Sequence, residues 1–211
     1  METKSYNETY LANVAENLGA MLEYAVECNF GLSEFWEKFV LSDAAKGIEK
    51  GNVRYLAGYS AADLLNAVAN SASEDKKEYK VTPFTDRSKY YWAGWILAQY
   101  QYHCGNTFFD INRALPIERV LEMYGVLHEA DVTKFFNIAD EKLSKLPKLS
   151  KLKKIRQARG LSQKKLAEKS GVDLRSIQMY EQRRNDINKA QAETLLKLSR
   201  VLGCRIEDLM D

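Results

Sequence analysis

Residues that begin and end helices recur at short intervals along the last 65 residues, which limits this region to a bundle of short helices. Ser150, Ser162 and Asp173 each precede a stretch with helical spacing, and a side-chain oxygen at such a position caps a helix N-terminus. Gly160 and Gly171 follow two of these stretches, where glycine accepts the left-handed conformation that ends a helix. The pattern predicts helices over residues 151–159, 163–170 and 174–182.

Two further helices are predicted before the end of the chain. Asn188, followed three residues later by Gln191, is typical of a capping box, and Gly203 ends the helix that this box begins. A short fifth helix carries Ile206 and Leu209. Apolar residues at helical spacing are predicted to fill one small core, made of Leu152, Ile155, Leu166, Ala167, Ile177, Tyr180, Leu195, Leu196, Val201 and Leu202.

The net charge of +2 is the sum of two halves with opposite charge. We place the boundary near Pro147, between a predicted domain of residues 1–146 and one of residues 147–211. The first holds 15 basic and 21 acidic residues, net −6, and the second holds 16 basic and 8 acidic residues, net +8. Of the 23 aromatic side chains, only Tyr180 lies in the second. A basic module of this kind favours a polyanion as its partner.

Residues 1–146 have the pattern of a second helical domain. Helices are predicted over residues 8–28, 86–102, 116–123 and 131–143, and two more after the caps Ser33 and Ser60. Pro116 suits the first turn of its helix, and Asp63 completes the cap at Ser60. The polar segment 71–85 is predicted to be an exposed loop. The sequence therefore predicts an all-α fold, with a helical N-terminal domain followed by a five-helix C-terminal domain.

The sequence holds no pattern typical of a catalytic, cofactor or metal site, and we predict that the chain is not an enzyme. Three separated cysteines and two histidines lack the spacing of a zinc site. Neighbouring residues on a helix point in different directions, so His103 is interpreted as a helix-end residue and Cys104 as packing. His128, with Glu129 and Asp131, is interpreted as a turn between helices.

Composition also indicates where such a chain is found. The longest apolar stretch is far below the roughly 18 residues that span a bilayer, and the polar start lacks the pattern of a signal peptide. Scattered, unpaired cysteines favour a reducing compartment. We therefore expect a cytoplasmic protein without a membrane partner.

The punctuation of the C-terminal domain is similar to that of a known family. Gly160-Leu-Ser-Gln163, Leu166-Ala167, Gly171-Val172, Ile177 and Glu181 follow the pattern of the Xre-like, Cro/repressor-type helix-turn-helix domain. The resemblance covers about residues 150–211. A short helix, a tight turn at Gly171 and a second helix form a corner that lets the second helix enter a DNA major groove.

This resemblance implies that residues 174–182 read base pairs of double-stranded DNA. The positions that face bases in the family are here Asp173, Leu174, Arg175, Gln178 and Met179. Arg175 is the best candidate for direct readout, because a guanidinium can bridge the O6 and N7 atoms of guanine. Gln178 suits an adenine edge, and Leu174 and Met179 suit thymine methyl groups.

Contacts to the DNA backbone are predicted around these positions. Gln163 begins the preceding helix, where its side chain and the helix N-terminus face a phosphate in the family. Phosphate contacts are further predicted for Lys164, Lys165, Arg183, Arg184 and Lys189. The segment 183–188 is long and basic where relatives often have a shorter loop with glycine, and Asp173 brings a negative charge near the DNA.

The leading interpretation is a sequence-specific transcriptional regulator, a repressor that binds DNA as a homodimer. The chain is similar to bacterial regulators of this type that carry the DNA-binding module at the C-terminus, some of which act as antitoxins. Residues 1–146 are therefore open to three alternatives: binding of a toxin protein, sensing of a small ligand, or oligomerisation of the chain with itself. Their aromatic residues are interpreted first as core, with a ligand pocket or a partner surface as the alternative.

Overall fold

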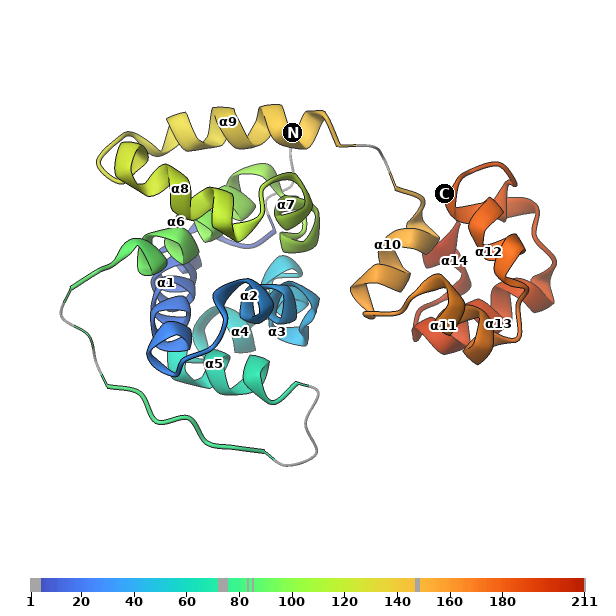
Figure 1. The fold of residues 1–211 in the computed structure, drawn as a ribbon, viewed down its shortest axis with the longest axis horizontal. Coiled ribbons are helices and arrows are strands. Elements are labelled where there is room, and N and C mark those ends of the chain that lie inside the picture. The colour runs from blue at the N-terminus through green and yellow to red at the C-terminus, as the bar shows by residue number, and fades with distance from the viewer. Residues whose placement is uncertain (1–4, 72–75, 83, 85, 147–148, 211) are drawn as a thin grey trace. The chain divides into compact units, whose positions relative to one another are not determined.

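The computed structural model describes residues 5–71, 76–82, 84, 86–146 and 149–210 (Figure 1). Within these residues the secondary structure consists of helices without any strand, which confirms the predicted all-α fold. The chain divides into two compact units, Met1–Leu146 (unit 1) and Pro147–Asp211 (unit 2). Pro147 itself, near which the sequence places the boundary, lies outside the described residues.

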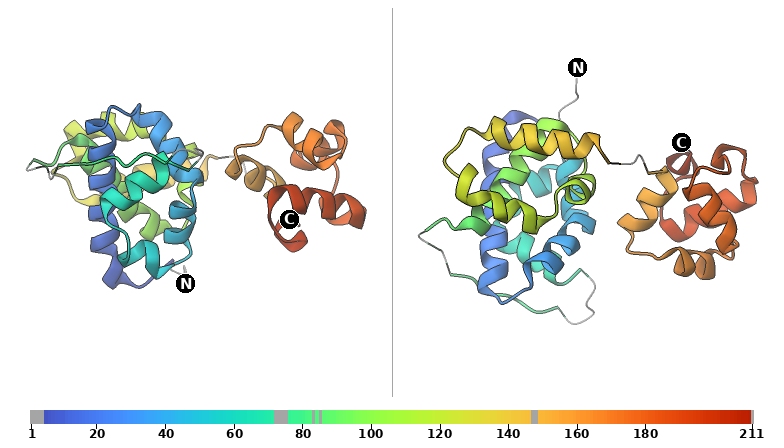
Figure 2. Two further views of the ribbon diagram at one scale, coloured as in Figure 1. Left: turned by 90° about the horizontal axis from the view of Figure 1, so that it is seen from below. Right: turned by 45° about the horizontal axis from the view of Figure 1, so that its top comes forward.

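The described part of unit 1 contains nine α-helices (Figures 1 and 2). They are α1 Leu11–Glu27, α2 Leu32–Leu41, α3 Asp43–Glu49, α4 Val53–Ala57, α5 Ala61–Ala69, α6 Lys89–Cys104, α7 Phe108–Ala114, α8 Ile117–Leu127 and α9 Val132–Ser144. A 3-10 turn, Glu8–Tyr10, precedes α1 and is capped by the Asn7 side chain. The long helix predicted from Glu8 therefore starts with a tighter turn before the α-helix begins.

Helices α1 and α6 pack against each other at the centre of unit 1 through two glycines. A Cβ atom on Gly94 of α6 would lie 2.3 Å from the carbonyl oxygen of Leu18 on α1. A Cβ atom on Gly19 of α1 would lie 2.8 Å from the carbonyl oxygen of Tyr91 on α6. Because neither residue carries a side chain, the two backbones approach closely, and α2, α4, α5, α8 and α9 each pack against one of these two helices.

Aromatic side chains form much of the core of unit 1. Trp36 is 1% exposed and stacks on Phe39, with ring centroids 4.9 Å apart. Phe108 meets both rings edge-on. Trp92 and Trp95 are only half-buried, so the interpretation of the aromatic residues as core is confirmed for Trp36 but only in part for these two.

The capping predictions in unit 1 have mixed outcomes. Ser60 and Asp63 form the predicted capping box at the start of α5. The prediction for Ser33 is wrong, because Gly31 precedes α2 and the Ser33 hydroxyl donates a hydrogen bond to Glu118 on α8 instead. Pro116 is the residue just before α8 rather than a member of its first turn. The cap at Asp131, which begins α9, agrees with the predicted helix.

The segment predicted as an exposed loop is attached to α5 where the structure describes it; residues 72–75, 83 and 85 lie outside the described part. The Asn66 side chain bonds both the amide and the carbonyl of Tyr79, at 2.8 and 3.2 Å. Asn70 does the same for Lys77, at 2.9 Å each way. The Tyr79 ring lies 5.0 Å from that of Phe30. Asparagine amides thus supply the hydrogen bonds that a neighbouring strand would otherwise provide.

Unit 2 contains five α-helices in its described part, as predicted. They are α10 Lys151–Ala158, α11 Gln163–Ser170, α12 Leu174–Glu181, α13 Ala192–Leu202 and α14 Ile206–Leu209. The predicted capping box at Asn188 is wrong: Asn188 lies in a 3-10 turn capped by Asp186, and α13 begins after Gln191. Leu196 is 40% exposed rather than in the core, where Leu198 is fully buried.

The close approach of α1 and α6 predicts opposite effects of the same substitution at two helical glycines. Gly94→Ala should lower the free energy of unfolding of unit 1 by about 1–3 kcal/mol, because the new methyl group meets the α1 backbone. Gly125→Ala in α8 should raise it by about 0.5–1 kcal/mol, because a Cβ there meets nothing within 4 Å. Urea denaturation followed by tryptophan fluorescence measures both, since all three tryptophans lie in unit 1. Equal effects at the two positions would contradict the close packing.

A buried carboxylate adds a pH dependence to unit 1. Glu49, at the end of α3, accepts a hydrogen bond from the Phe108 amide at 2.7 Å. Burial raises the pKa of Glu49 to about 7, and it outweighs the hydrogen bond from Phe108 and the charges of Lys46 and Lys50, which lower the pKa; the charge of Asp110 adds a smaller raising effect. The folded state therefore keeps a proton on Glu49 at a pH where the unfolded chain has released it.

Ionisation of Glu49 should lower the stability of unit 1 as the pH rises from about 4.5 to about 7. Above that range Glu49 is ionised in both states and should cause little further change. Glu49→Gln removes the ionisation but keeps an oxygen that accepts from Phe108. The variant should be more stable than the parent by about 2–3 kcal/mol at pH 8 and no more stable below pH 4.5. Denaturation by urea at several pH values measures this, and a gain that is equal at all pH values would show that ionisation is not the cause.

Candidate nucleic-acid interface

Two capped helices and a glycine turn form the corner that the sequence predicts. Ser162 caps α11 by accepting a hydrogen bond from the Lys165 amide at 3.0 Å. Gly171 ends α11 in the left-handed conformation, with φ 68°, and Asp173 caps α12 by accepting from the Ser176 amide. Only three residues separate the two helices, so the turn leaves little freedom in the angle between them.

A small apolar core holds this corner rigid. Leu166 of α11 and Ile177 of α12 are fully buried, and Val172 between the helices is 8% exposed. They pack with residues from the other helices of unit 2, among them Leu152 of α10 and Leu198 of α13. The other three helices of unit 2, α10, α13 and α14, therefore hold the corner in place.

A buried ion pair joins α10 to the end of α12. The Arg156 guanidinium donates to both carboxylate oxygens of Glu181, at 2.5 and 2.8 Å, and to the carbonyl oxygen of Leu161 at 2.6 Å. Gln163, the first residue of α11, donates from its side-chain amide to Glu181 at 2.7 Å. The Glu181 carboxylate, at the end of α12, thus connects this helix to α10 and to the start of α11. The buried charges of Arg156 and Glu181 neutralise each other.

Arg156 holds the corner in place but is not among the site residues predicted from the sequence. It lies four residues after the core residue Leu152, so both face the same side of α10. A charged residue at a core-facing position needs a buried partner. That signal was available in the sequence, because Glu181 occupies a corresponding core-facing position four residues after Ile177.

The structure brings the predicted base-reading residues together on α12. Arg175 is exposed, and Leu174, Gln178 and Met179 are half-buried. Among the described residues, the Arg175 side chain makes no ion pair or hydrogen bond, so its guanidinium is free to bind an external acceptor. The Asp173 carboxylate accepts a hydrogen bond from the Ser176 amide, so its negative charge is partly balanced by the positive N-terminal end of the α12 dipole.

The predicted phosphate contacts lie around α12. Lys164 and Lys165, in the first turn of α11, and Arg184 are exposed. Lys189 is exposed and lies 3.9 Å from the Asp186 carboxylate. The Gln163 amide group is held by Glu181, which leaves its second N–H and its oxygen for a further partner.

The loop after α12 has the geometry of a glycine-ended helix but carries an arginine instead. Arg183 adopts φ 58°, its amide donates to Tyr180, and the Arg184 amide donates to Met179. This is the Schellman pattern, in which glycine normally takes the left-handed position. The long basic segment therefore keeps the backbone turn of shorter glycine loops and adds a cation at the turn itself.

The histidines and cysteines of unit 1 are placed as the sequence suggests for packing and helix ends. His103 stacks on Phe136, with ring centroids 4.5 Å apart, and Cys104 packs against the core. His128 is the residue after α8 and bonds the Tyr124 carbonyl at 2.8 Å. In the part of the chain that the structure describes, no three His, Cys, Asp or Glu residues gather as a metal site would require.

Comparison with known families identifies unit 2. Residues 152–209 match the family model described as Helix-turn-helix, whereas the N-terminal region matches no family model. No curated protein and no solved structure matches the chain. The C-terminal unit is therefore an Xre-like helix-turn-helix domain of the Cro/repressor type, and it supports a role as a DNA-binding transcriptional regulator. None of the described helices is long and apolar enough to cross a membrane.

The buried ion pair predicts a large difference between single and double substitutions. Arg156→Met leaves the Glu181 carboxylate buried without its partner and should destabilise unit 2 by about 3–5 kcal/mol. Arg156→Met combined with Glu181→Leu removes both charges and should recover most of that loss. Hydrogen exchange of the α10–α12 amides in the full chain measures both. If the double variant is as unstable as the single one, the pair is not the main link between the helices.

Proposed function

We propose that the chain is a sequence-specific transcriptional repressor whose unit 2 places α12 in the major groove of double-stranded DNA. The observation that carries the proposal is the rigid corner of α11 and α12, with Arg175 exposed and uncommitted among the described residues. An arginine at that place can donate two hydrogen bonds to a guanine edge and so discriminates between base pairs.

Charge supports the assignment of DNA binding to unit 2 alone. Its net charge is +8, whereas that of unit 1 is −6. Phosphate contacts from Lys164, Lys165, Arg183, Arg184 and Lys189 would set the orientation of α12 without reading sequence. Each contact releases counterions, so the affinity should fall steeply as the salt concentration rises. Unit 1 would be repelled by the same DNA surface.

The repressor is proposed to act as a homodimer in the cytoplasm. A homodimer would bind two half-sites whose centres lie about 34–36 Å apart, or a multiple of that distance. Repression follows if such a site overlaps a promoter, and the chain would act in the cytoplasm without catalysing a reaction.

Unit 1 is proposed to control the DNA-binding unit through its own partner. The sequence leaves a toxin protein, a small ligand or a second copy of the chain as alternatives, and a half-buried aromatic surface at Trp92 and Trp95 is compatible with each. A pull-down of the chain from a strain that also expresses the genes adjacent to its own tests the toxin alternative. Binding of a defined small molecule to unit 1 tests the ligand alternative.

Two substitutions in unit 2 should affect DNA binding in different ways. Arg175→Ala should reduce discrimination at one base pair by about 1–3 kcal/mol. Lys165→Ala should weaken binding to all sequences similarly and flatten the dependence of affinity on salt. Fluorescence anisotropy separates the two effects. It uses a DNA site selected by the chain from random duplexes, together with single-base variants of that site, at several salt concentrations. Lys142→Ala in unit 1 is the control for loss of one exposed cation.

If Arg175→Ala weakens binding to every sequence equally, Arg175 contacts phosphate and the base-reading assignment is wrong. If neither variant changes binding, α12 is not the helix in the groove.

A further inference from the structure

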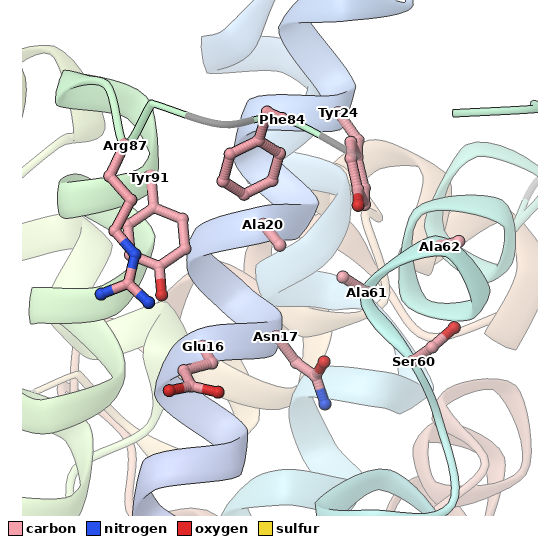
Figure 3. Close-up of a pocket in the computed structure, with 10 residues that line it drawn as sticks. All are labelled: Glu16, Asn17, Ala20, Tyr24, Ser60, Ala61, Ala62, Phe84, Arg87 and Tyr91. Carbon is pink, nitrogen blue, oxygen red and sulfur yellow. The ribbon is translucent and has the colours of Figure 1, made fainter. Parts of the chain in front are cut away.

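Unit 1 contains an open hollow of about 520 Å³ between α1, the start of α5, and three residues at or before the start of α6, Phe84, Arg87 and Tyr91 (Figure 3). Ala20 and Asn17 of α1 lie between its two sides. Arg87 and Tyr91 line one side, and Ser60 to Ala62 line the other. The volume falls in the range of small-molecule sites in proteins.

Three aromatic rings follow one another around the Ala20 end of the hollow. Phe84 lies edge-on to Tyr24, with ring centroids 5.5 Å apart, and edge-on to Tyr91 at 5.7 Å. The rings line the hollow beside the methyl group of Ala20, where a longer side chain would occupy the space (Figure 3). This end therefore suits a flat apolar group, which aromatic rings meet edge-on or offset.

Two charges of opposite sign line the hollow without pairing. Among the described residues, the Glu16 carboxylate makes no ion pair or hydrogen bond. The Arg87 guanidinium lies 4.7 Å from the centroid of the Tyr91 ring and forms no ion pair with any described residue. No ion pair joins Glu16 and Arg87, so their charged groups lie more than 4 Å apart and both can pair with a ligand. A ligand that carries both charges close together would complete each of them.

Asn17 adds an oriented hydrogen-bond acceptor next to Glu16. Its side-chain N–H₂ group donates to the Tyr59 carbonyl at 3.1 Å. That bond fixes which end of the amide is nitrogen, so the oxygen is presented as an acceptor. Glu16 and Asn17 thus each present an acceptor oxygen at the hollow, and either oxygen suits an ammonium group, which donates up to three hydrogen bonds.

We propose that this hollow binds a free amino acid with an aromatic side chain. Its ammonium group lies toward Glu16 and Asn17, its carboxylate toward Arg87, and its ring among Tyr24, Phe84 and Tyr91. A simple anion would leave Glu16 unpaired at the site, and a simple cation would face Arg87. A zwitterion satisfies both groups, and the aromatic wall selects among zwitterions by side chain. The inference does not depend on DNA binding, because every contact lies in unit 1.

Isothermal titration calorimetry of the full chain with L-phenylalanine tests the proposal, with two analogues that each lack one charge. 3-Phenylpropionate lacks the ammonium group, and 2-phenylethylamine lacks the carboxylate. L-phenylalanine should bind at one site per chain, and each analogue should bind at least about tenfold more weakly. L-alanine, which lacks the ring, should also bind more weakly.

Matched variants assign each charge of the ligand to a residue. Glu16→Gln should weaken L-phenylalanine about tenfold without weakening 3-phenylpropionate; Arg87→Gln should weaken L-phenylalanine without weakening 2-phenylethylamine. Ala20→Leu should abolish binding of all three by filling the hollow. Glu27→Gln, on the same helix but outside the hollow, should change nothing.

Absence of saturable binding of L-phenylalanine at millimolar concentration would overturn the proposal. So would analogues that bind as well as L-phenylalanine, or variants that weaken all ligands equally. Because the titration contains no DNA, these outcomes leave the DNA-binding proposal untouched, and a failure of DNA binding leaves this one untouched.

Discussion

The DNA-binding unit depends on one buried ion pair. Glu181, at the end of α12, accepts hydrogen bonds from Arg156 of α10 and from Gln163 at the start of α11. The apolar core of unit 2 is small, and its buried residues are aliphatic. Such a core resists unfolding but does little to fix the direction of a short helix, because aliphatic contacts are not directional. The hydrogen bonds to Glu181 supply that direction.

This arrangement explains how two helices of eight residues each can present a surface of fixed shape. Helices of this length are marginal in isolation and need tertiary contacts. Here each has a side-chain cap at its N-terminus, a fixed turn at its C-terminus and a share in one buried carboxylate. The contacts that hold α12 in place therefore do not involve its exposed side, and the polar side chains there are available to a partner.

Much of unit 2 could be predicted because its helix ends are written locally. Ser150, Ser162, Asp173 and Gly171 act through the backbone of their own helices, so sequence spacing is enough to place them. The errors arise where a side chain has a choice of partners. Ser33 bonds a carboxylate 85 residues away, and that partner cannot be seen from local sequence.

The same reasoning accounts for the elements that were not predicted. The helices α3, α4 and α7 have seven residues or fewer, too few for an apolar period to show. Arg156 and its partner Glu181, 25 residues later, both occupy core-facing positions, so the pair is found only when the two helices are considered together. In unit 1 the hollow follows from which side chains line α1, α5 and α6 together, and helical spacing within each helix does not reveal it. Long-range pairing, rather than helix formation, is what the sequence left open.

Unit 2 is proposed to read DNA sequence through the major groove. Selection of binding sites by the full chain from a pool of random DNA duplexes, followed by methylation protection of the selected site, tests it most directly. Readout by α12 predicts enrichment of one motif with protected guanine N7 atoms, which lie in the major groove. An unenriched pool, or a selected site whose guanines stay reactive at N7 while binding is complete, would contradict it.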